Sequence, residues 1–299
     1  MPSPTGSAAT DLDTLTRPSG GFAMLAVDQR EALRAMFAER YGRPVADAEL
    51  TAFKVETVRQ LSPYASGVLL DRQFCLDAVL EADAVAPGCG LIAAADEFAG
   101  DDREFVATVQ IDEAVVPGEV KAAGAVALKL LVLWRPDEAP DGRIAMTEEF
   151  VRRCKEAGLL SIVEPVSRGP RDGSTWTPED WNEGVFAAAR ELGNRGQDLY
   201  KAEVPLHGGG DEAAVRRGCA ELTRSIDGPW VVLSTGVPHE QFPRAVELAC
   251  GEGASGFLAG RAVWRQVIGA DDQAAALETY AVPRLRELGD IVDQVVTNR

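Results

Sequence analysis

The sequence predicts one α/β domain in which eight parallel strands alternate with helices, and three observations support this. The chain has 299 residues, of which 46% are hydrophobic and 26% charged, as in ordinary globular proteins. Short runs of almost purely apolar residues recur along it, which is typical of parallel strands covered on both faces. Amphipathic stretches of helical length separate these runs. Together they predict a single (β/α)8 barrel, and a doubly wound open sheet is the alternative.

The predicted strands follow one another at regular intervals from residue 22 onward. They span Phe22–Asp28, Gly67–Asp71, Leu91–Asp96, Ala127–Trp134, Leu159–Val166, Asp198–Pro205, Trp230–Val237 and Gly256–Gly260. Several of the helices between them end at a glycine, which is typical of a helix C-cap. The predicted helices are Glu31–Ala38, Thr51–Leu61, Asp112–Ala123, Glu148–Ala157, Pro178–Leu192, Glu212–Ile226, Gln241–Cys250 and Pro283–Val296.

The domain boundaries follow from composition. Residues 1–16 are small and polar, so we expect a disordered tail there, followed by a catalytic barrel over 17–299. The segment Gly251–Gly256 matches the glycine pattern of dinucleotide-binding loops. A predicted helix precedes it and a strand follows, which is the reverse of the order that such a loop requires. We therefore interpret it as a helix-to-strand turn.

Charge and residue usage exclude several classes of function. The net charge of −17 argues against a nucleic-acid partner, which would need clustered positive charge. His207 and His239 are too far apart to share a helix face, and the five cysteines contain no Cys-x-x-Cys pair, so we expect no metal site. We find no secretory signal or apolar run long enough to span a membrane, and we expect a cytoplasmic protein with no membrane partner.

Four charged residues interrupt the apolar runs or end them, and they carry the functional hypothesis. Asp28 ends the first predicted strand, Lys129 lies in the fourth, Glu164 in the fifth and Lys201 in the sixth, with Glu203 two residues beyond it on the same face. Lysine and glutamate are rarely buried without a partner. Ion pairs that only fill the barrel interior are one explanation, and a catalytic cluster at the carboxyl ends of the strands is the other.

The catalytic interpretation is covalent catalysis by a lysine amine. Burial and a neighbouring cation such as Lys129 would depress the pKa of Lys201, which must lose its proton to attack a ketone. The resulting iminium withdraws electrons from the adjacent carbon–carbon bond, and Glu164 and Asp28 are placed to shuttle protons.

A second group of residues lies after the seventh and eighth strands. Ser234 and Gly236 follow one strand, and Gly260 and Arg261 end the other. Barrel loops at these positions often bind a phosphate through backbone N–H groups, and an arginine adds a bidentate cation. An anion site beside a reactive lysine predicts a phosphorylated ketose or ketone as substrate, although the glycines could also be simple turns.

Four stretches resemble one family of class I aldolases, the sulfofructosephosphate aldolases, which are related to the tagatose-bisphosphate aldolases. They begin at Gly20 (GGFAMLAVDQRE), Leu61 (LSPYAS), Leu128 (LKLLVLWR) and Gly253 (GASGFLAGRAVW), within a resemblance that runs from about Thr16 to the end. It implies cleavage of 6-deoxy-6-sulfofructose 1-phosphate to dihydroxyacetone phosphate and 3-sulfolactaldehyde by a homo-oligomer, without metal or cofactor. It also implies that Lys201 forms the Schiff base, that Asp28, Lys129 and Glu164 assist, and that Ser234, Gly236, Gly260 and Arg261 bind phosphate.

Some features depart from that pattern or leave alternatives open. Ala202 stands where the family more often has valine, and the second strand ends in Asp71 and Arg72 rather than a lysine. The sequence does not decide which residues would distinguish a sulfonate from a phosphate; the candidates are Gln29, Arg30, Arg72, Arg135 and His207. Of these, Gln29 is predicted to bind substrate. The same chemistry on tagatose or fructose bisphosphate is one alternative. A non-catalytic barrel that binds a sugar phosphate is another, and an isomerase that uses only carboxylates is a third.

Overall fold

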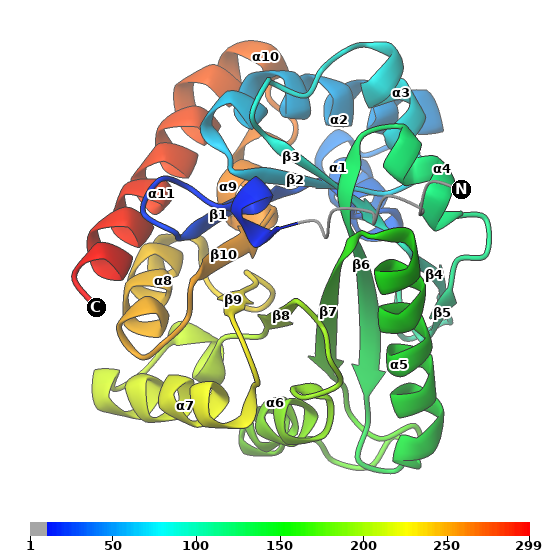
Figure 1. Cartoon of the computed structure of the whole chain (residues 1–299). Coiled ribbons are helices and arrows are strands. Elements are labelled where there is room, and N and C mark those ends of the chain that lie inside the picture. The colour runs from blue at the N-terminus through cyan, green and yellow to red at the C-terminus, as the bar shows by residue number, and fades with distance from the viewer. Residues whose placement is uncertain (1–10) are drawn as a thin grey trace, which may run out of the picture.

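The computed structural model, which describes residues 11–299, contains a closed barrel of eight parallel strands (Figure 1). The barrel closes because β10 pairs with β1, with Phe22 opposite Gly256. This confirms the predicted fold, and each predicted strand corresponds to one barrel strand. In order around the barrel they are β1 (Phe22–Ala26), β2 (Gly67–Leu70), β3 (Gly90–Ala94), β6 (Ala125–Trp134), β7 (Leu160–Ser167), β8 (Leu199–Ala202), β9 (Trp230–Val232) and β10 (Gly256–Ala259).

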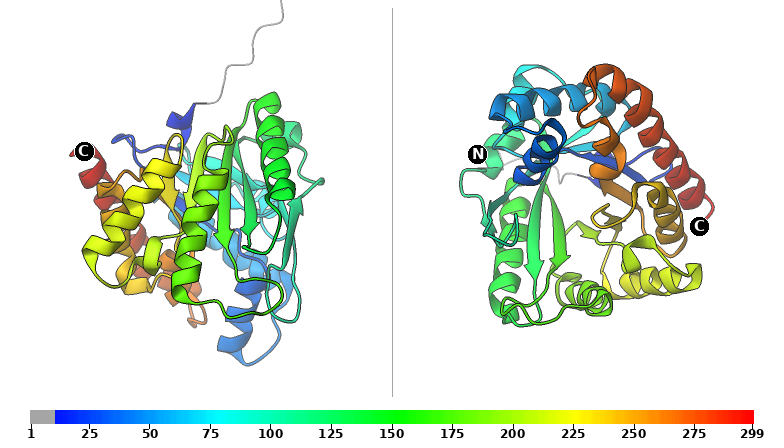
Figure 2. Two further views of the ribbon diagram at one scale, coloured as in Figure 1. Left: turned by 90° about the horizontal axis from the view of Figure 1, so that it is seen from below. Right: turned by 180° about the vertical axis from the view of Figure 1, so that it is seen from behind.

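Helices surround the barrel on the outside (Figure 2). The longer ones are α1 (Glu31–Tyr41), α2 (Asp47–Leu61), α5 (Pro140–Ala157), α6 (Pro178–Leu192), α7 (Glu212–Ser225), α8 (Phe242–Gly251) and α11 (Val282–Thr297). The shorter ones are α3 (Leu76–Glu81), α4 (Pro117–Ala122), α9 (Arg261–Trp264) and α10 (Gln273–Ala276). Single turns are η2 (Ser62–Tyr64), η3 (Pro205–Gly208), η4 (His239–Gln241), η5 (Arg265–Val267) and the π-helical turn η6 (Leu277–Ala281). No helix of the described chain is long and apolar enough to cross a membrane.

Proline and capping residues explain where several helices begin. The helix α6 covers the predicted range because Thr177 forms a reciprocal capping box with Asp180 and Pro178 follows at the first helical position. The helix α4 begins at Pro117 rather than Asp112, and α5 begins at Pro140, ahead of the predicted Glu148. In both cases a proline occupies the first turn, where its missing N–H costs nothing.

An antiparallel hairpin that the sequence did not predict follows β3. Its strands are β4 (Asp96–Ala99) and β5 (Thr108–Ile111), with Asp96 opposite Ile111. The loop between them contributes side chains to the cavity at the carboxyl end of the barrel. Half of the residues in its two short strands are polar and most are at least partly exposed, so its pattern is that of a loop.

The amino-terminal segment differs from its prediction. Residues 1–10 lie outside the described part of the chain, but Leu12–Leu15 form the turn η1, so the expectation of a disordered tail through residue 16 is wrong there. Leu15 is fully buried among the apolar residues inside the barrel. Gly67 and Gly90 make room for it, since a Cβ on either would lie within 3 Å of the leucine Cδ2.

Apolar side chains fill the lower part of the barrel interior. They form one cluster that includes Leu15, Met24, Ala26, Leu69, Ile92, Ala94, Ala127, Ile162, Leu199, Val231 and Leu258. A second and larger cluster lies between the strands and the helices. This division fits a barrel in which alternate residues of each strand point inward.

Candidate active site

The pleat of the strands places a layer of charged residues directly above the apolar interior. Each member follows an inward-pointing apolar residue by two positions, so its side chain points inward as well. The pairs are Ala26 with Asp28, Ala94 with Asp96, Ala127 with Lys129, Ile162 with Glu164 and Leu199 with Lys201. The structure therefore brings together the four predicted catalytic residues and adds Asp96.

Lys129 lies at the centre of this layer and is fully buried. Its Nζ is 2.8 Å from Asp28 Oδ2, 2.7 Å from Asp96 Oδ2 and 3.1 Å from Glu164 Oε2. Burial opposes its charge, but these three carboxylates outweigh that effect and raise the pKa of Lys129 well above its usual value. Lys129 is thus a fixed cation at the centre of the charged layer.

The pKa of Asp28 is shifted in the opposite direction, downward. Burial alone would raise the pKa of Asp28, but attraction to Lys129 and then to Lys201 outweighs burial, and the pKa falls well below its usual value. Asp28 therefore stays an anion, able to accept hydrogen bonds and protons but unsuited to hold a proton at neutral pH.

Lys201 contacts the other side of Glu164. Its Nζ is 3.0 Å from Glu164 Oε1, and the side chain is 4% exposed and lines the cavity. Glu164 is thus shared by both lysines. Its Oε2, although close to Lys129, accepts no hydrogen bond from any residue of the described chain.

The charges of the cluster balance when Arg30 is included. Arg30 Nη2 is 2.9 Å from Asp96 Oδ1, so three cations face three carboxylates. A proton that moves from Lys201 to Glu164 leaves this balance unchanged. The site can therefore generate a neutral amine without placing a net charge in the barrel.

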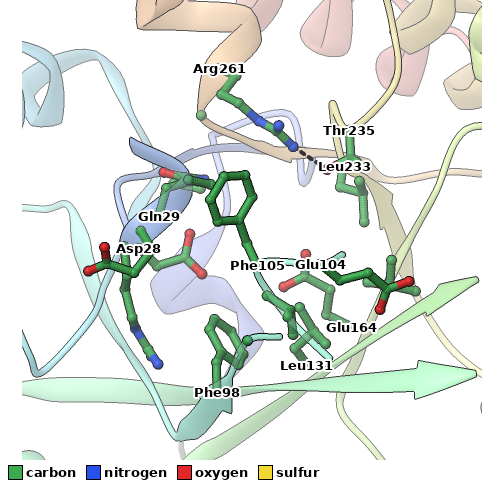
Figure 3. Close-up of a pocket in the computed structure, with 18 of the residues that line it drawn as sticks. Asp28, Gln29, Phe98, Glu104, Phe105, Leu131, Glu164, Leu233, Thr235 and Arg261 are labelled. Carbon is green, nitrogen blue, oxygen red and sulfur yellow. Dashed lines mark hydrogen bonds between the residues drawn. The ribbon is translucent and has the colours of Figure 1, made fainter. Parts of the chain in front are cut away.

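The cluster opens into a cavity of about 690 Å³ at the carboxyl end of the strands (Figure 3). Asp28, Glu164 and Lys201 form part of its wall, and apolar side chains form another part. Among these are Phe98, Phe105, Leu131 and Leu233, two of them from the hairpin and its loop. A volume of this size is in the range of small-molecule sites.

Three of the four predicted phosphate-binding residues line the cavity. They are Ser234, Gly260 and Arg261, and Thr235 joins them. Arg261 Nη2 donates a hydrogen bond of 2.7 Å to Thr235 Oγ1 (Figure 3). Burial lowers the pKa of Arg261, but a guanidinium keeps its charge in proteins, so the group presents a partly desolvated cation.

Gln29, predicted to bind substrate, lies beside Gly260. A Cβ at residue 260 would lie 2.3 Å from the Ala26 carbonyl oxygen and 3.0 Å from Gln29 Nε2, so glycine permits this approach. Gln29 lines the cavity, and its buried Oε1 accepts no hydrogen bond within the described chain. It is thus available to a ligand hydroxyl.

Gly236, which was predicted to bind phosphate, is the one of the four that does not line the cavity. Its φ is +77°, and a Cβ there would lie 2.2 Å from His207 Nδ1. The glycine is needed for this contact and for the turn. His207 itself also lies outside the cavity wall, as do Arg72, which pairs with Asp112 at 2.9 Å, and Arg135, which pairs with Glu104.

Glu203 does not share the face of Lys201. The strand β8 ends at Ala202, so the alternation of the pleat no longer applies. Instead Glu203 accepts a hydrogen bond from the Ser167 N–H at 2.8 Å and one from the Trp181 side chain. Burial is the main cause that raises the pKa of Glu203 to about 7.

The sequence alone does not identify two contributions to the site, one to the charged layer and one to the cavity wall. Asp96 was interpreted as the end of a strand, although it follows Ala94 by the same spacing that marks the other four charged residues. Arg103 and Phe105 come from the unpredicted hairpin loop, for which the sequence carries no periodic signal.

Known proteins of similar sequence are aldolases. The profile of the DeoC/LacD family aldolases matches residues 22–266. Curated relatives include a tagatose 1,6-diphosphate aldolase of Listeria monocytogenes, 26% identical over 95% of this chain and 90% of the relative. Another is tagatose 1,6-diphosphate aldolase 2 of Enterococcus faecalis, 28% identical over 93% and 88%.

Similar solved structures show the same fold. The fructose-bisphosphate aldolase of Plasmodium falciparum aligns with a TM-score of 0.72 and 15% identity, covering 95% of this chain and 93% of its own. An archaeal fructose 1,6-bisphosphate aldolase aligns with a TM-score of 0.61 and 17% identity, covering 95% and 98%. The family profile spans the whole charged layer, from Asp28 to Lys201, and extends past Arg261. The chain therefore belongs to the DeoC/LacD family of aldolases and is an aldehyde-lyase.

Proposed function

We propose that this aldolase cleaves a phosphorylated ketose through a Schiff base on Lys201. The observation that supports this most directly is the position of Lys201, which lines the cavity and has Glu164 within 3.0 Å. A lysine nucleophile needs a group that takes its proton and returns it, and a carboxylate at this distance can do both.

Proton transfer from Lys201 to Glu164 Oε1 would begin the reaction. The neutral amine then adds to the ketone carbon and forms a carbinolamine, whose hydroxyl takes up a proton and leaves as water. The resulting iminium draws the electrons of the C3–C4 bond into an enamine as the C4 hydroxyl gives its proton to a carboxylate. Glu164 is the principal shuttle in this scheme, and Asp28 assists at the carbinolamine stage.

Lys129 has a different role in this proposal. As a permanent cation between Asp28, Asp96 and Glu164, it holds both shuttle carboxylates in place and attracts substrate oxygens. The phosphate of the dihydroxyacetone half would bind Arg261, Ser234 and the backbone beside Gly260, where the cavity offers a half-buried cation and close backbone approach.

For the other end of the substrate we propose a sulfonate, as in 6-deoxy-6-sulfofructose 1-phosphate. The resemblance of four sequence stretches supports this, and so does the charge of the cavity wall. Five carboxylates and five cations line it: Asp28, Glu31, Asp101, Glu104 and Glu164 against Arg30, Arg103, Arg168, Lys201 and Arg261. Arg30 and Lys201 already have carboxylate partners. A sulfonate carries one negative charge and a phosphate nearly two, so a sulfonate needs fewer free cations.

Tagatose 1,6-bisphosphate is the second candidate, because the curated relatives named above are tagatose aldolases. Steady-state kcat/KM for the sulfo sugar, tagatose 1,6-bisphosphate and fructose 1,6-bisphosphate distinguishes the two. We expect the sulfo sugar to exceed both bisphosphates by at least about tenfold, which corresponds to about 1.4 kcal/mol of transition-state binding. A preference for either bisphosphate would contradict the sulfonate assignment while leaving the Schiff-base mechanism intact.

The Lys201→Ala variant tests the mechanism in the same assay. It should lose turnover of every sugar while remaining folded, and Lys155→Ala, which removes an exposed lysine of α5, should keep it. A wild-type chain that binds these sugars and cleaves none of them would instead be a non-catalytic binding barrel.

A further inference from the structure

The chain that leaves β8, the strand of Lys201, enters a strained turn. Leu206 and His207 have φ values of +55° and +50°, and Gly208 follows at +70°. The left-handed region is unfavourable for residues with a Cβ, at about 1 kcal/mol or more for each. Two such residues in succession persist only where surrounding contacts hold them.

Several contacts with surrounding residues hold this turn. The Leu206 N–H donates to Asn182 Oδ1 at 2.9 Å, and the His207 N–H donates to the Val204 carbonyl at 3.0 Å. Arg244 Nη1 donates to the Gly208 carbonyl at 3.1 Å. The His207 ring stacks on Trp181, with ring centroids 3.6 Å apart and planes inclined by 22°.

Trp181 is itself fixed in place. It is 8% exposed and its side chain forms a hydrogen bond with Glu203, the buried carboxyl two residues beyond Lys201. The His207 ring is thus supported, through Trp181, by the residue that follows the strand of the proposed nucleophile.

An edge of the ring lies against the loop after β9. The ring forms a hydrogen bond with the Thr235 backbone, and its Nδ1 edge lies against the bare Cα of Gly236. The Thr235 side chain in turn accepts the hydrogen bond from Arg261. One ring therefore contacts two successive residues of the loop that, with Arg261, borders the cavity.

We propose that His207 is a positioning residue for the substrate phosphate, whose ring sets the backbone of Ser234, Thr235 and Gly236 so that this loop and Arg261 converge. The inference rests on the proposed function, in which the phosphate binds at this loop. His207 acts only through the loop, since it does not line the cavity.

The ionisation of the ring is consistent with this role. Burial is the main effect on the ring and lowers the pKa of His207, although the bond to Thr235 opposes the change. A neutral imidazole packs against tryptophan and glycine without bringing a charge that would compete for the phosphate.

The test compares two ketones that differ only in the phosphate. The protein is incubated with increasing concentrations of dihydroxyacetone phosphate or of dihydroxyacetone in the presence of borohydride. Intact mass then gives the ketone concentration at which adduct formation is half-maximal. The variant is His207→Asn, because asparagine tolerates the left-handed backbone but lacks the ring. We expect the half-saturating concentration of dihydroxyacetone phosphate to rise about 10- to 100-fold, as for loss of a charge-assisted contact, with dihydroxyacetone unchanged.

Gly236→Ala approaches the same contact from the opposite side. Its Cβ collides with the ring, so we expect the same phosphate-specific defect, and part of that defect should disappear in the His207→Asn background. Equal shifts for both ketones, or none in the folded variants, would overturn the positioning role alone. A wild-type chain that traps neither ketone would overturn the proposed function, and the positioning role with it.

Discussion

Asp96 is the most deeply buried carboxylate of the charged layer, and its contacts distinguish it from Asp28 and Glu164. It is fully buried and does not line the cavity. Its Oδ2 accepts from Lys129 Nζ at 2.7 Å and from the Leu131 N–H at 3.0 Å, while Oδ1 faces Arg30. Asp96 thus holds Lys129 from behind, and we regard it as a positioning residue.

Asp96→Asn should therefore weaken the fold as well as the reaction. The amide keeps the size of the side chain but leaves three cations, two of them buried lysines, opposite two carboxylates. We expect the free energy of unfolding at pH 7 to fall by about 3 kcal/mol, as when one partner of a buried ion pair is removed. Urea denaturation measures this, and kcat should fall with it because Lys129 is no longer fixed.

Glu97, the exposed residue that follows Asp96, provides the control variant. Glu97→Gln removes a carboxylate from the same strand outside the charged layer, and it should change the unfolding free energy by no more than about 0.5 kcal/mol. If Asp96→Asn changed the free energy of unfolding as little as Glu97→Gln, the stability of the cluster would not depend on Asp96.

At the scale of elements, the turn η1 closes the lower end of the barrel. Leu15 reaches the interior between Gly67 and Gly90 and packs with the inner apolar cluster. Leu15→Ala should lower the free energy of unfolding by about 2–5 kcal/mol, because it empties a fully buried site.

Leu12→Ala is the matched control for this prediction. Leu12 lies in the same turn but is only partly buried, so the loss should be clearly smaller. Equal losses for the two variants would mean that η1 does not seal the barrel, and thermal or urea unfolding distinguishes the cases.

The elements differ in how far the sequence determines them. The barrel strands were predictable because each is a nearly continuous apolar run, and the spacing of two from an apolar residue placed Asp28, Lys129, Glu164 and Lys201 in one layer. The turn η1 was not predictable, since its single buried leucine depends on the space left by two distant glycines and on packing with residues of other strands.

The contact of Gly236 with His207 was equally hidden. It joins the loops that follow two neighbouring strands. It also depends on a left-handed turn that no local sequence pattern predicts. The hairpin of β4 and β5 escaped prediction because its polar residues resemble those of a loop.

At the scale of the whole molecule, the overall charge and the charge of the cavity differ. The chain carries a net charge of −17, whereas the cavity wall has equal numbers of carboxylates and cations. An anionic substrate is therefore held by local cations such as Arg261 and not by the field of the molecule.

The free energy of unfolding should depend on pH through the titration of Glu203. Its folded pKa of about 7 lies above the usual value of 4.5, so the folded state binds an extra proton between these limits. The stability that this proton confers is complete below about pH 4.5 and is lost as the pH rises through about 7. The free energy of unfolding of the wild type should therefore decline between pH 5 and 8. In Glu203→Gln that decline should be smaller by up to ~3 kcal/mol.

Glu179→Gln, an exposed change at the start of α6, should leave that profile as it is in the wild type. Urea unfolding at several pH values measures the difference between the two variants. A Glu203→Gln profile parallel to the wild-type profile would show that Glu203 titrates normally.

The Schiff base at Lys201 is tested most directly by identifying the lysine that forms the imine. The protein is incubated with dihydroxyacetone phosphate and borohydride, its intact mass is measured, and the modified peptide is mapped. We expect one adduct, on Lys201, which is absent from Lys201→Ala and retained in Lys155→Ala. An adduct on another lysine, or none on a chain shown to be folded, would contradict a Schiff base at Lys201.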